Sequence, residues 1–272
     1  MKILFLATQW GAEHLAFEDF LIRAKTNGYD GIDTWVPESA TERSHFFKLL
    51  NEYQLAVVCH QHQATGNNIE AFCRSYEYYL NLCMEWNPLL INSHSGKDFF
   101  SLEDKLKVID TAQEFAAKNN IIVAHETHHG RIGYSPYESR DLFALRPEMQ
   151  ITADLSHWTC VTESYLENCG PILQDAITRA KHLHARVGFT EGPQVSDPRA
   201  REWETARNTF MNWWLQIIKV KKQQGTHTFT ITPEFGPPPY MPTDPATGSP
   251  LSDQFSVNNW IKESIKKHCL VI

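Results

Sequence analysis

The sequence lacks the cysteine patterns that mark disulfide frameworks and zinc ribbons. No Cys-x-x-Cys pair occurs, and the six cysteines lie far apart, at Cys59, Cys73, Cys83, Cys160, Cys169 and Cys269. Closely paired cysteines are what a structural zinc site or a small disulfide-rich domain needs. We therefore expect reduced, mostly buried thiols, as in a cytoplasmic protein.

Long apolar runs and long basic runs are also missing. No stretch approaches the roughly 18 consecutive apolar residues of a membrane helix, and the apolar start at 2–7 is too short for a signal-peptide core. The formal net charge is −7, and no basic run exceeds two lysines. Since binding to nucleic acid depends on clustered positive charge, the sequence predicts neither a membrane nor a nucleic-acid partner.

The sequence also has no Gly-rich phosphate turn, no low-complexity segment and no linker. The first apolar segment runs into Ala7-Thr8-Gln9-Trp10-Gly11, which is not the turn that follows the first strand of a doubly wound nucleotide-binding sheet. The length of 272 residues is close to the ~250 residues of one (β/α)8 barrel. We therefore expect one domain spanning residues 1–272.

What is present is an eightfold alternation of strand-like and helix-like segments. The strand-like segments are 2–8, 29–35, 55–62, 89–94, 121–127, 150–155, 181–187 and 227–234. Helical patterns cover 17–26, 42–53, 69–83, 102–118, 137–147, 164–180, 202–224 and 255–267. This alternation, with long segments after several strands, predicts a single (β/α)8 TIM barrel whose site lies at the C-terminal ends of the strands.

Acidic and histidine side chains gather at those strand ends. Four of the strand-like segments carry such a residue at or near their ends: Glu126, Asp154, His184 and Glu234. Because side chains two apart share a face of a strand, each can be assigned to a polar face opposite an apolar one. Single strand-end carboxylates are usually solvated, but four matching positions predict a metal site. Its oxygen and nitrogen donors suit Mn²⁺, Mg²⁺ or Co²⁺, and Zn²⁺ also fits.

These strand ends resemble those of a known superfamily. The matching segments are Ala124-His125-Glu126-Thr127, Asp154-Leu155-Ser156-His157-Trp158, His182-Leu183-His184-Ala185-Arg186 and Pro233-Glu234-Phe235-Gly236. Together they resemble the xylose isomerase-like TIM barrels, which include sugar isomerases, ketose 3-epimerases and type IV apurinic endonucleases. The resemblance extends over all eight strand and helix units of the chain.

The resemblance implies a metal-dependent sugar isomerase or epimerase. In the epimerase branch the four residues above bind one metal, and the two glutamates, here Glu126 and Glu234, form the acid/base pair. Proton transfer would then pass through an enediolate of a small carbohydrate substrate. The resemblance also implies substrate contacts for His157 and Arg186, although Arg186 follows the strand-seven histidine at a shorter offset than in the ketose epimerases.

The other histidines are assigned from their positions along or after the strands. His184 lies one pleat nearer the C-terminal rim than His182 and is therefore assigned to the metal site. For His182, a role as a hydrogen-bonded core residue is as well supported as a role in the site. His125 has the parity of a residue that packs against a helix. His128 and His129 are expected to lie in the loop that follows.

A rival interpretation depends on His62 and His94, which end the third and fourth strands. In the endonuclease branch, histidines at these places join the shared glutamate to bind a second zinc. The further Asp-x-His element of that branch is missing, because Asp197 is not followed by a histidine two residues later. A dinuclear zinc hydrolase thus stays open, but the negative charge argues against a DNA substrate, and substrate contact is the favoured role of both histidines.

Aromatic residues at the rim point to a carbohydrate ligand. Trp10 and Trp35 follow the first two strands, where flat rings either stack on sugar C–H faces or pack in the core. After strand eight, the prolines at 237–239 offer no N–H donors for a phosphate group. A third class, a barrel that binds metal or sugar without turnover, is disfavoured by the two glutamates. The pattern leaves the substrate, the metal and any homo-oligomer undetermined.

Overall fold

Eight parallel strands close into a barrel in the computed structural model, which describes residues 1–270. They are β1 (Lys2–Thr8), β2 (Gly31–Thr34), β3 (Ala56–Gln61), β4 (Ile91–Ser93), β5 (Val123–Glu126), β6 (Ile151–Ala153), β7 (Ala180–Ala185) and β8 (Thr228–Pro233). Pairing of β1 with β8 closes the sheet, with Lys2 beside Thr228. The predicted (β/α)8 barrel is confirmed, and the strands lie in their expected segments, with β7 beginning one residue early.

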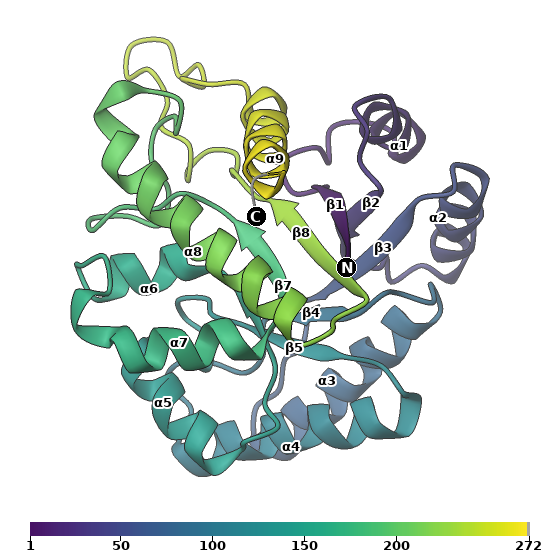
Figure 1. Cartoon of the computed structure of the whole chain (residues 1–272). Coiled ribbons are helices and arrows are strands. Elements are labelled where there is room, and N and C mark those ends of the chain that lie inside the picture. Colours follow the sequence, from purple (N-terminus) through teal and green to yellow (C-terminus); the bar gives the residue numbers. More distant parts are fainter. Residues whose placement is uncertain (271–272) are drawn as a thin grey trace.

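Helices surround the barrel (Figure 1). They are α1 (Phe17–Thr26), α2 (Ala40–Glu52), α3 (Ile69–Met84), α4 (Leu102–Asn119), α5 (Pro136–Leu145), α6 (Leu155–Val161), α7 (Gly170–Arg179), α8 (Glu204–Gln223) and α9 (Gln254–Cys269). Side-chain caps start several of them; the Ser101 hydroxyl, for example, accepts a hydrogen bond from the Asp104 N–H. The predicted helices are present, with α7 shorter than expected. Helix α6 was not predicted because its seven residues directly follow β6 and are too few to show a helical period.

The barrel is apolar at one level and polar at another. Leu6, Val58, Leu90 and Ala124 form a small buried cluster of their own, with Ile122 packed against it. The opposite faces of the strands pack on the helices and form the main core. In β3, β4 and β5, the inward positions beyond this apolar cluster are polar or ionisable. The interior therefore changes from a hydrophobic plug to a polar chamber toward the strand ends.

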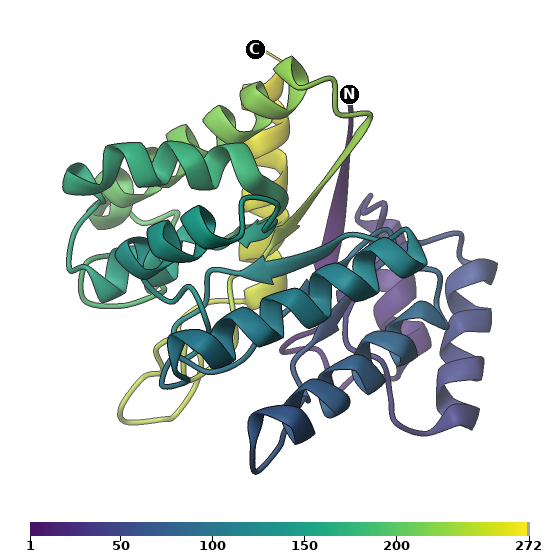
Figure 2. The same cartoon turned by 90° about the horizontal axis from the view of Figure 1, so that it is seen from below.

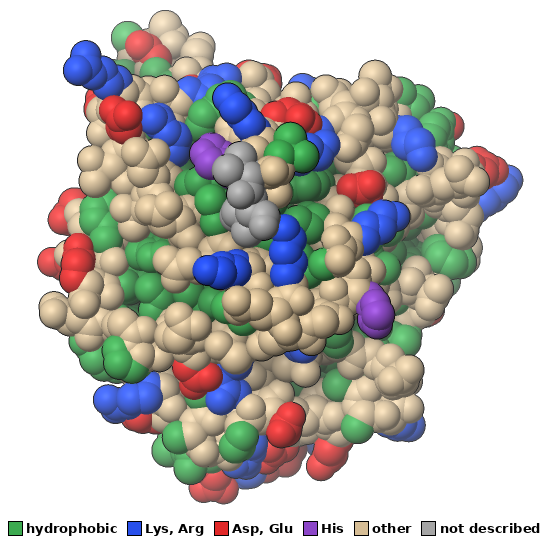
Figure 3. Space-filling model, viewed as in Figure 1, with side chains coloured by type: hydrophobic (Ala, Val, Ile, Leu, Met, Phe, Trp, Pro, Cys, Tyr) green, Lys and Arg blue, Asp and Glu red, His purple; other side chains and the backbone are tan. Residues whose placement is uncertain are grey.

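The two ends of the barrel differ in their loops. In Figure 2 both termini lie at one end, and the loop that links β8 to α9 lies at the opposite end. The face that bears the termini carries both basic and acidic side chains (Figure 3). The polar chamber opens at the other end, among the loops that follow the strands. No helix within residues 1–270 combines the length and hydropathy needed to cross a membrane.

Candidate functional site

The four residues at the strand ends meet in one buried cluster. Glu126 is the last residue of β5, His184 lies in β7, and Asp154 and Glu234 directly follow β6 and β8. One ligand atom from each lies within 4.8 Å of those of the other three. Asp154 also starts α6, because its Oδ1 accepts a hydrogen bond from the Ser156 N–H at 3.1 Å. Parallel strands with one inward parity thus bring residues 108 positions apart in the chain to the same point.

Asp33 on β2 fixes the orientation of the His184 ring. Its Oδ2 lies 3.0 Å from His184 Nε2 and 3.1 Å from His182 Nε2, and it accepts a hydrogen bond from the Thr232 hydroxyl. His184 Nδ1 is thereby turned toward the carboxylates, 2.8 Å from Glu234 Oε2. A carboxylate behind a histidine commonly orients that histidine as a metal ligand. Sequence reasoning missed Asp33, although its place near the end of the short β2 was a usable signal.

His182 lies deeper in the barrel and is held by hydrogen bonds. Its Nδ1 lies 2.7 Å from the Thr230 hydroxyl, while its Nε2 faces Asp33. The ring is completely buried. This is the environment expected for a hydrogen-bonded core histidine, and it leaves His184 as the residue whose free nitrogen faces the cluster.

Glu126 is surrounded by nitrogen atoms. Its Oε2 accepts a hydrogen bond from Asn92 Nδ2 at 2.7 Å and lies 3.1 Å from His94 Nε2. Burial raises the pKa of the Glu126 carboxyl, but His94 and His184 outweigh this effect and hold the pKa well below its usual range. The carboxylate is therefore ionised in the folded protein.

A second group of donors shares Glu126, and here one sequence expectation is wrong. His60, His94 and Glu126 lie together, whereas the sequence interpretation had combined His94 with His62. His62 is one pleat beyond His60, so its side chain is exposed at the cavity mouth instead. Strand parity could not separate the two, because both face inward.

Arg186 bridges two members of the first cluster. Its Nη2 lies 2.8 Å from Asp154 Oδ2 and 2.7 Å from Glu234 Oε2. The guanidinium carbon also lies 5.3 Å from the Trp10 ring centre and 4.9 Å from that of Tyr240, within range of a cation–π interaction. Arg186 lines the cavity as expected of a substrate contact, and it additionally positions both carboxylates.

His157 is buried behind the cavity, not in its wall. It lies on α6, with Nε2 3.4 Å from Asp154 Oδ2 and Nδ1 2.5 Å from His129 Nδ1. Burial lowers the pKa of His157 well below its usual value, and the nearby Arg186 lowers it further. His157 is not among the residues that line the cavity, and the substrate contact that the resemblance implies for it stays a prediction.

His128 lies in the loop after β5, as expected, but it also lines the cavity. The chain turns back after β5, with the His128 N–H donating to the Glu126 carbonyl at 2.8 Å. The His128 ring is therefore directed inward, with ring centres 4.3 Å from His94 and 4.0 Å from His157. His129, the neighbouring residue, remains exposed.

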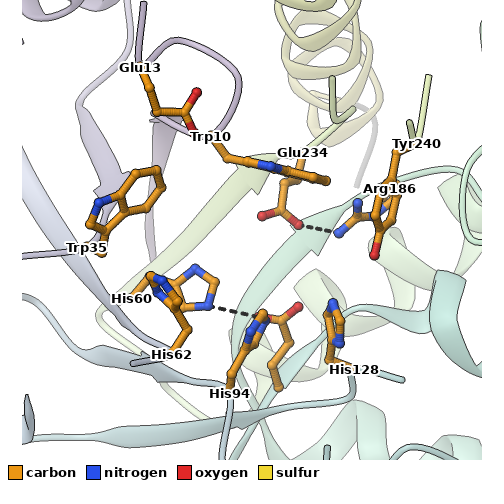
Figure 4. A pocket seen from close by; sticks show the side chains of 11 residues that line it. Trp10, Glu13, Trp35, His60, His62, His94, His128, Arg186, Glu234 and Tyr240 are labelled. Atoms are coloured by element: carbon orange, nitrogen blue, oxygen red, sulfur yellow. Dashed lines mark hydrogen bonds and ion pairs between the residues drawn. The ribbon is translucent and has the colours of Figure 1, made fainter. Parts of the chain in front are cut away.

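The cluster forms one side of a cavity of about 330 Å³, a volume within the usual range of small-molecule sites. Figure 4 shows Trp35 and Tyr240 on opposite sides of it, with Arg186 beside Tyr240. Its lining consists of Trp10, Glu13, Trp35, His60, His62, His94, Glu126, His128, Arg186, Glu234 and Tyr240. Glu13 and Tyr240 were missed by sequence reasoning, because both come from loops whose path no local pattern predicts.

Comparison with known proteins gives structural matches alone: no family model matches the sequence, and no curated protein matches it. D-allulose 3-epimerase from Methylomonas sp., solved in complex with D-allulose, has a TM-score of 0.68 at 16% identity over 98% of this chain and 97% of that one. A xylose isomerase domain protein from Salmonella typhimurium has a TM-score of 0.62 at 13% identity, covering 97% and 96%. This chain has a xylose isomerase-like TIM-barrel fold.

The same barrel is also similar to endonuclease IV from Thermus thermophilus, with a TM-score of 0.60 at 13% identity over 98% of this chain and 100% of that one. The xylose isomerase-like fold thus spans proteins named as epimerases and as nucleases. The resemblance inferred from the motifs is confirmed at the level of the fold. At such identities the comparison carries no activity over to this chain.

The residues present in this xylose isomerase-like barrel fit a divalent metal ion. Asp33, Glu126, Asp154 and Glu234 are all buried, and Arg186 is the guanidinium that faces two of them. Buried carboxylates in such excess require a compensating positive charge. His184 Nδ1 faces Glu234 Oε2 at 2.8 Å and Glu126 Oε1 at 3.6 Å, and an ion held by these residues would take the place of the ring proton there.

Proposed function

We propose that the protein is a divalent-metal-dependent isomerase or epimerase of small sugars. The observation that carries the proposal is the meeting of two buried carboxylates, Glu126 and Glu234, at one cavity, with Nδ1 of His184 facing both. Together with Asp154, these residues would hold the ion. A bound ion of this kind polarises a carbonyl and the hydroxyl beside it, which makes the C–H bond between them more acidic.

The two glutamates are placed to move that proton. Both line the cavity, and each is oriented by a neighbour: Glu126 by Asn92, and Glu234 by Arg186. One carboxylate removes the proton from the carbon beside the carbonyl. In an epimerisation the other returns it from the opposite face; in an isomerisation the proton is delivered to the adjacent carbon.

The walls of the cavity suit an unphosphorylated sugar. The rings of Trp10, Trp35 and Tyr240 offer apolar surfaces for the C–H faces of a sugar. His62 and His94 offer nitrogen atoms to its hydroxyl groups. After β8, the prolines at 237–239 provide no amide donors for a phosphate. These contacts support a substrate the size of a free monosaccharide.

A metal-dependent exchange experiment tests the proposal. Protein purified without chelator is analysed for Mn, Co, Mg and Zn, then incubated with a panel of ketoses and aldoses in D₂O. We expect tightly bound divalent metal and deuterium incorporation at a carbon next to the carbonyl, measured by NMR. The Asp154→Ala/Glu234→Ala variant should lose that metal and the exchange, because two of the four proposed ligands are removed.

The matched control is Asp19→Ala, which removes an exposed carboxylate from α1. It should keep both the metal content and the exchange rate. A wild-type protein that stays metal-free in the presence of added divalent ions would overturn the proposal. Metal binding without exchange on any sugar of a broad panel would instead indicate a non-catalytic barrel.

The His60, His94 and Glu126 group favours one alternative, a dinuclear zinc phosphodiesterase. In such an enzyme these residues and the four-residue cluster, which share Glu126, would hold two ions, and the ions would supply an activated water for attack on a phosphate ester. Hydrolysis of bis(p-nitrophenyl) phosphate and of DNA with abasic sites would reveal it. The net charge of −7 disfavours the DNA substrate, so we expect no cleavage of that DNA.

Gly236→Ala should weaken sugar binding while leaving the barrel folded. A Cβ at Gly236 would overlap the Trp10 indole, so the indole must move from its place in the cavity wall. For the sugar that shows deuterium exchange in the panel, we expect KM to rise about tenfold, which corresponds to ~1.4 kcal/mol of lost binding free energy. Gly170→Ala is the control, because its Cβ would meet open space. An unchanged KM in Gly236→Ala would show that Trp10 does not contact the sugar.

A further inference from the structure

Three histidines form a separate cluster beside the cavity: His128, His129 and His157. One nitrogen atom of each lies within 4.8 Å of those of the other two. His157 is completely buried, His128 is half-buried and lines the cavity, and His129 is exposed. The cluster contains none of the carboxylates assigned above, and the function proposed for the sugar site does not use it.

The contacts of these rings bring their nitrogen atoms close together. His157 Nε2 lies 3.4 Å from Asp154 Oδ2, so the carboxylate favours the ring proton on Nε2 and leaves the lone pair on Nδ1. That Nδ1 lies 2.5 Å from His129 Nδ1, which donates a hydrogen bond to it, and a bound ion would take the place of the shared proton. His128 Nδ1 lies 2.5 Å from the His129 carbonyl, which places the ring proton of His128 there and frees its Nε2.

Asp154 stands behind His157 as Asp33 stands behind His184. In both pairs a buried carboxylate faces one imidazole nitrogen, and the other nitrogen is directed into a group of possible ligands. Carboxylates in this position orient histidine ligands and increase their basicity. In residues 1–270, His157 Nε2 has no hydrogen-bond partner with good geometry, so its place beside Asp154 is not explained by core packing alone.

We propose that His128, His129 and His157 bind a further divalent ion of the zinc type. Three neutral imidazoles suit Zn²⁺, and three protein ligands leave a fourth position open for water or substrate. Zn–N bonds of ~2.0–2.1 Å in a tetrahedral site hold the ligand nitrogens farther apart than His129 Nδ1 and His157 Nδ1 lie, so the exposed His129 would rotate outward as the ion replaces the shared proton. Because His128 lines the cavity, the ion lies at its edge.

Metal counting on four variants tests this site apart from the sugar site. The chelator-treated protein is titrated with Zn²⁺ against a chromogenic zinc indicator, and with Co²⁺ followed by visible absorption. His129→Ala removes an exposed ligand of the new site, Glu234→Ala removes a ligand of the four-residue cluster, and His45→Ala removes an exposed histidine on α2. Circular dichroism and thermal midpoints establish that each variant is folded, and His128→Gln repeats the first test at a second ligand.

We expect His129→Ala and His128→Gln each to bind one zinc fewer per chain than wild type and to lose the absorption of tetrahedral Co²⁺. His45→Ala should match wild type. If His129→Ala retains every ion, the three-histidine site is wrong, whatever Glu234→Ala does. If Glu234→Ala alone retains every ion, the three-histidine site stands and the metal site of the proposed function fails. Loss of all ions in a folded His129→Ala would contradict a separate site.

Discussion

Glu126→Gln and Glu234→Gln are each expected to lower kcat by about 10²–10⁴, the usual contribution of a positioned acid or base. Glutamine keeps the shape of the side chain, and its carbonyl oxygen can still accept the hydrogen bond that Asn92 donates to Glu126. Glutamine cannot take and return a proton, and it is also a weaker ligand for the ion, so turnover is measured at saturating metal. The thermal midpoint should therefore change little, and kcat and deuterium exchange on the responsive sugar are the measurements.

The two variants also distinguish epimerisation from isomerisation. If the glutamates act on opposite faces, Glu126→Gln should retain exchange starting from one epimer and Glu234→Gln from the other. The matched control is Glu191→Gln, an exposed glutamate in the loop after β7, which should behave as wild type. Near-normal turnover in both site variants would show that Glu126 and Glu234 are not the acid and base.

Asp33→Ala should destabilise the fold strongly. Asp33 faces His182, His184 and the Thr232 hydroxyl while almost fully buried. Removing Asp33 leaves the other polar groups of this network buried without a partner, which lowers the free energy of unfolding by about 3–5 kcal/mol. Urea denaturation at pH 7 would measure this loss in the free energy of unfolding.

Asp33→Asn separates orientation from stability. Asparagine is nearly isosteric, but its neutral oxygen is a weaker acceptor for the His184 ring, so the ring loses part of its orientation. Outer partners of metal ligands typically change metal affinity by roughly 10–100-fold, and we expect a loss in that range by metal titration. Asp19→Asn, on the exposed side of α1, should match wild type. Unchanged metal affinity in Asp33→Asn would mean that Asp33 serves stability alone.

The sequence by itself determined the eight strand and helix units and the inward parity of the strand-end residues. Both properties are local, since a strand alternates its side chains every residue and a helix repeats about every 3.6. Glu126, Asp154, His184 and Glu234 could therefore be named as one set from pattern alone. Local pattern also placed His182 deeper than His184, because their difference is one pleat of one strand.

Only the tertiary structure decided which residues far apart in the chain share one point in space. Asp33 and His184 are 151 residues apart, and their contact depends on barrel closure and on the register between strands. The choice of His60 over His62 beside Glu126, and the inward turn of His128, depend on the same geometry. Tyr240 reaches the cavity because its loop folds over the rim of the barrel. The path of that loop depends on packing against the closed barrel, and no periodic pattern in the sequence predicts it.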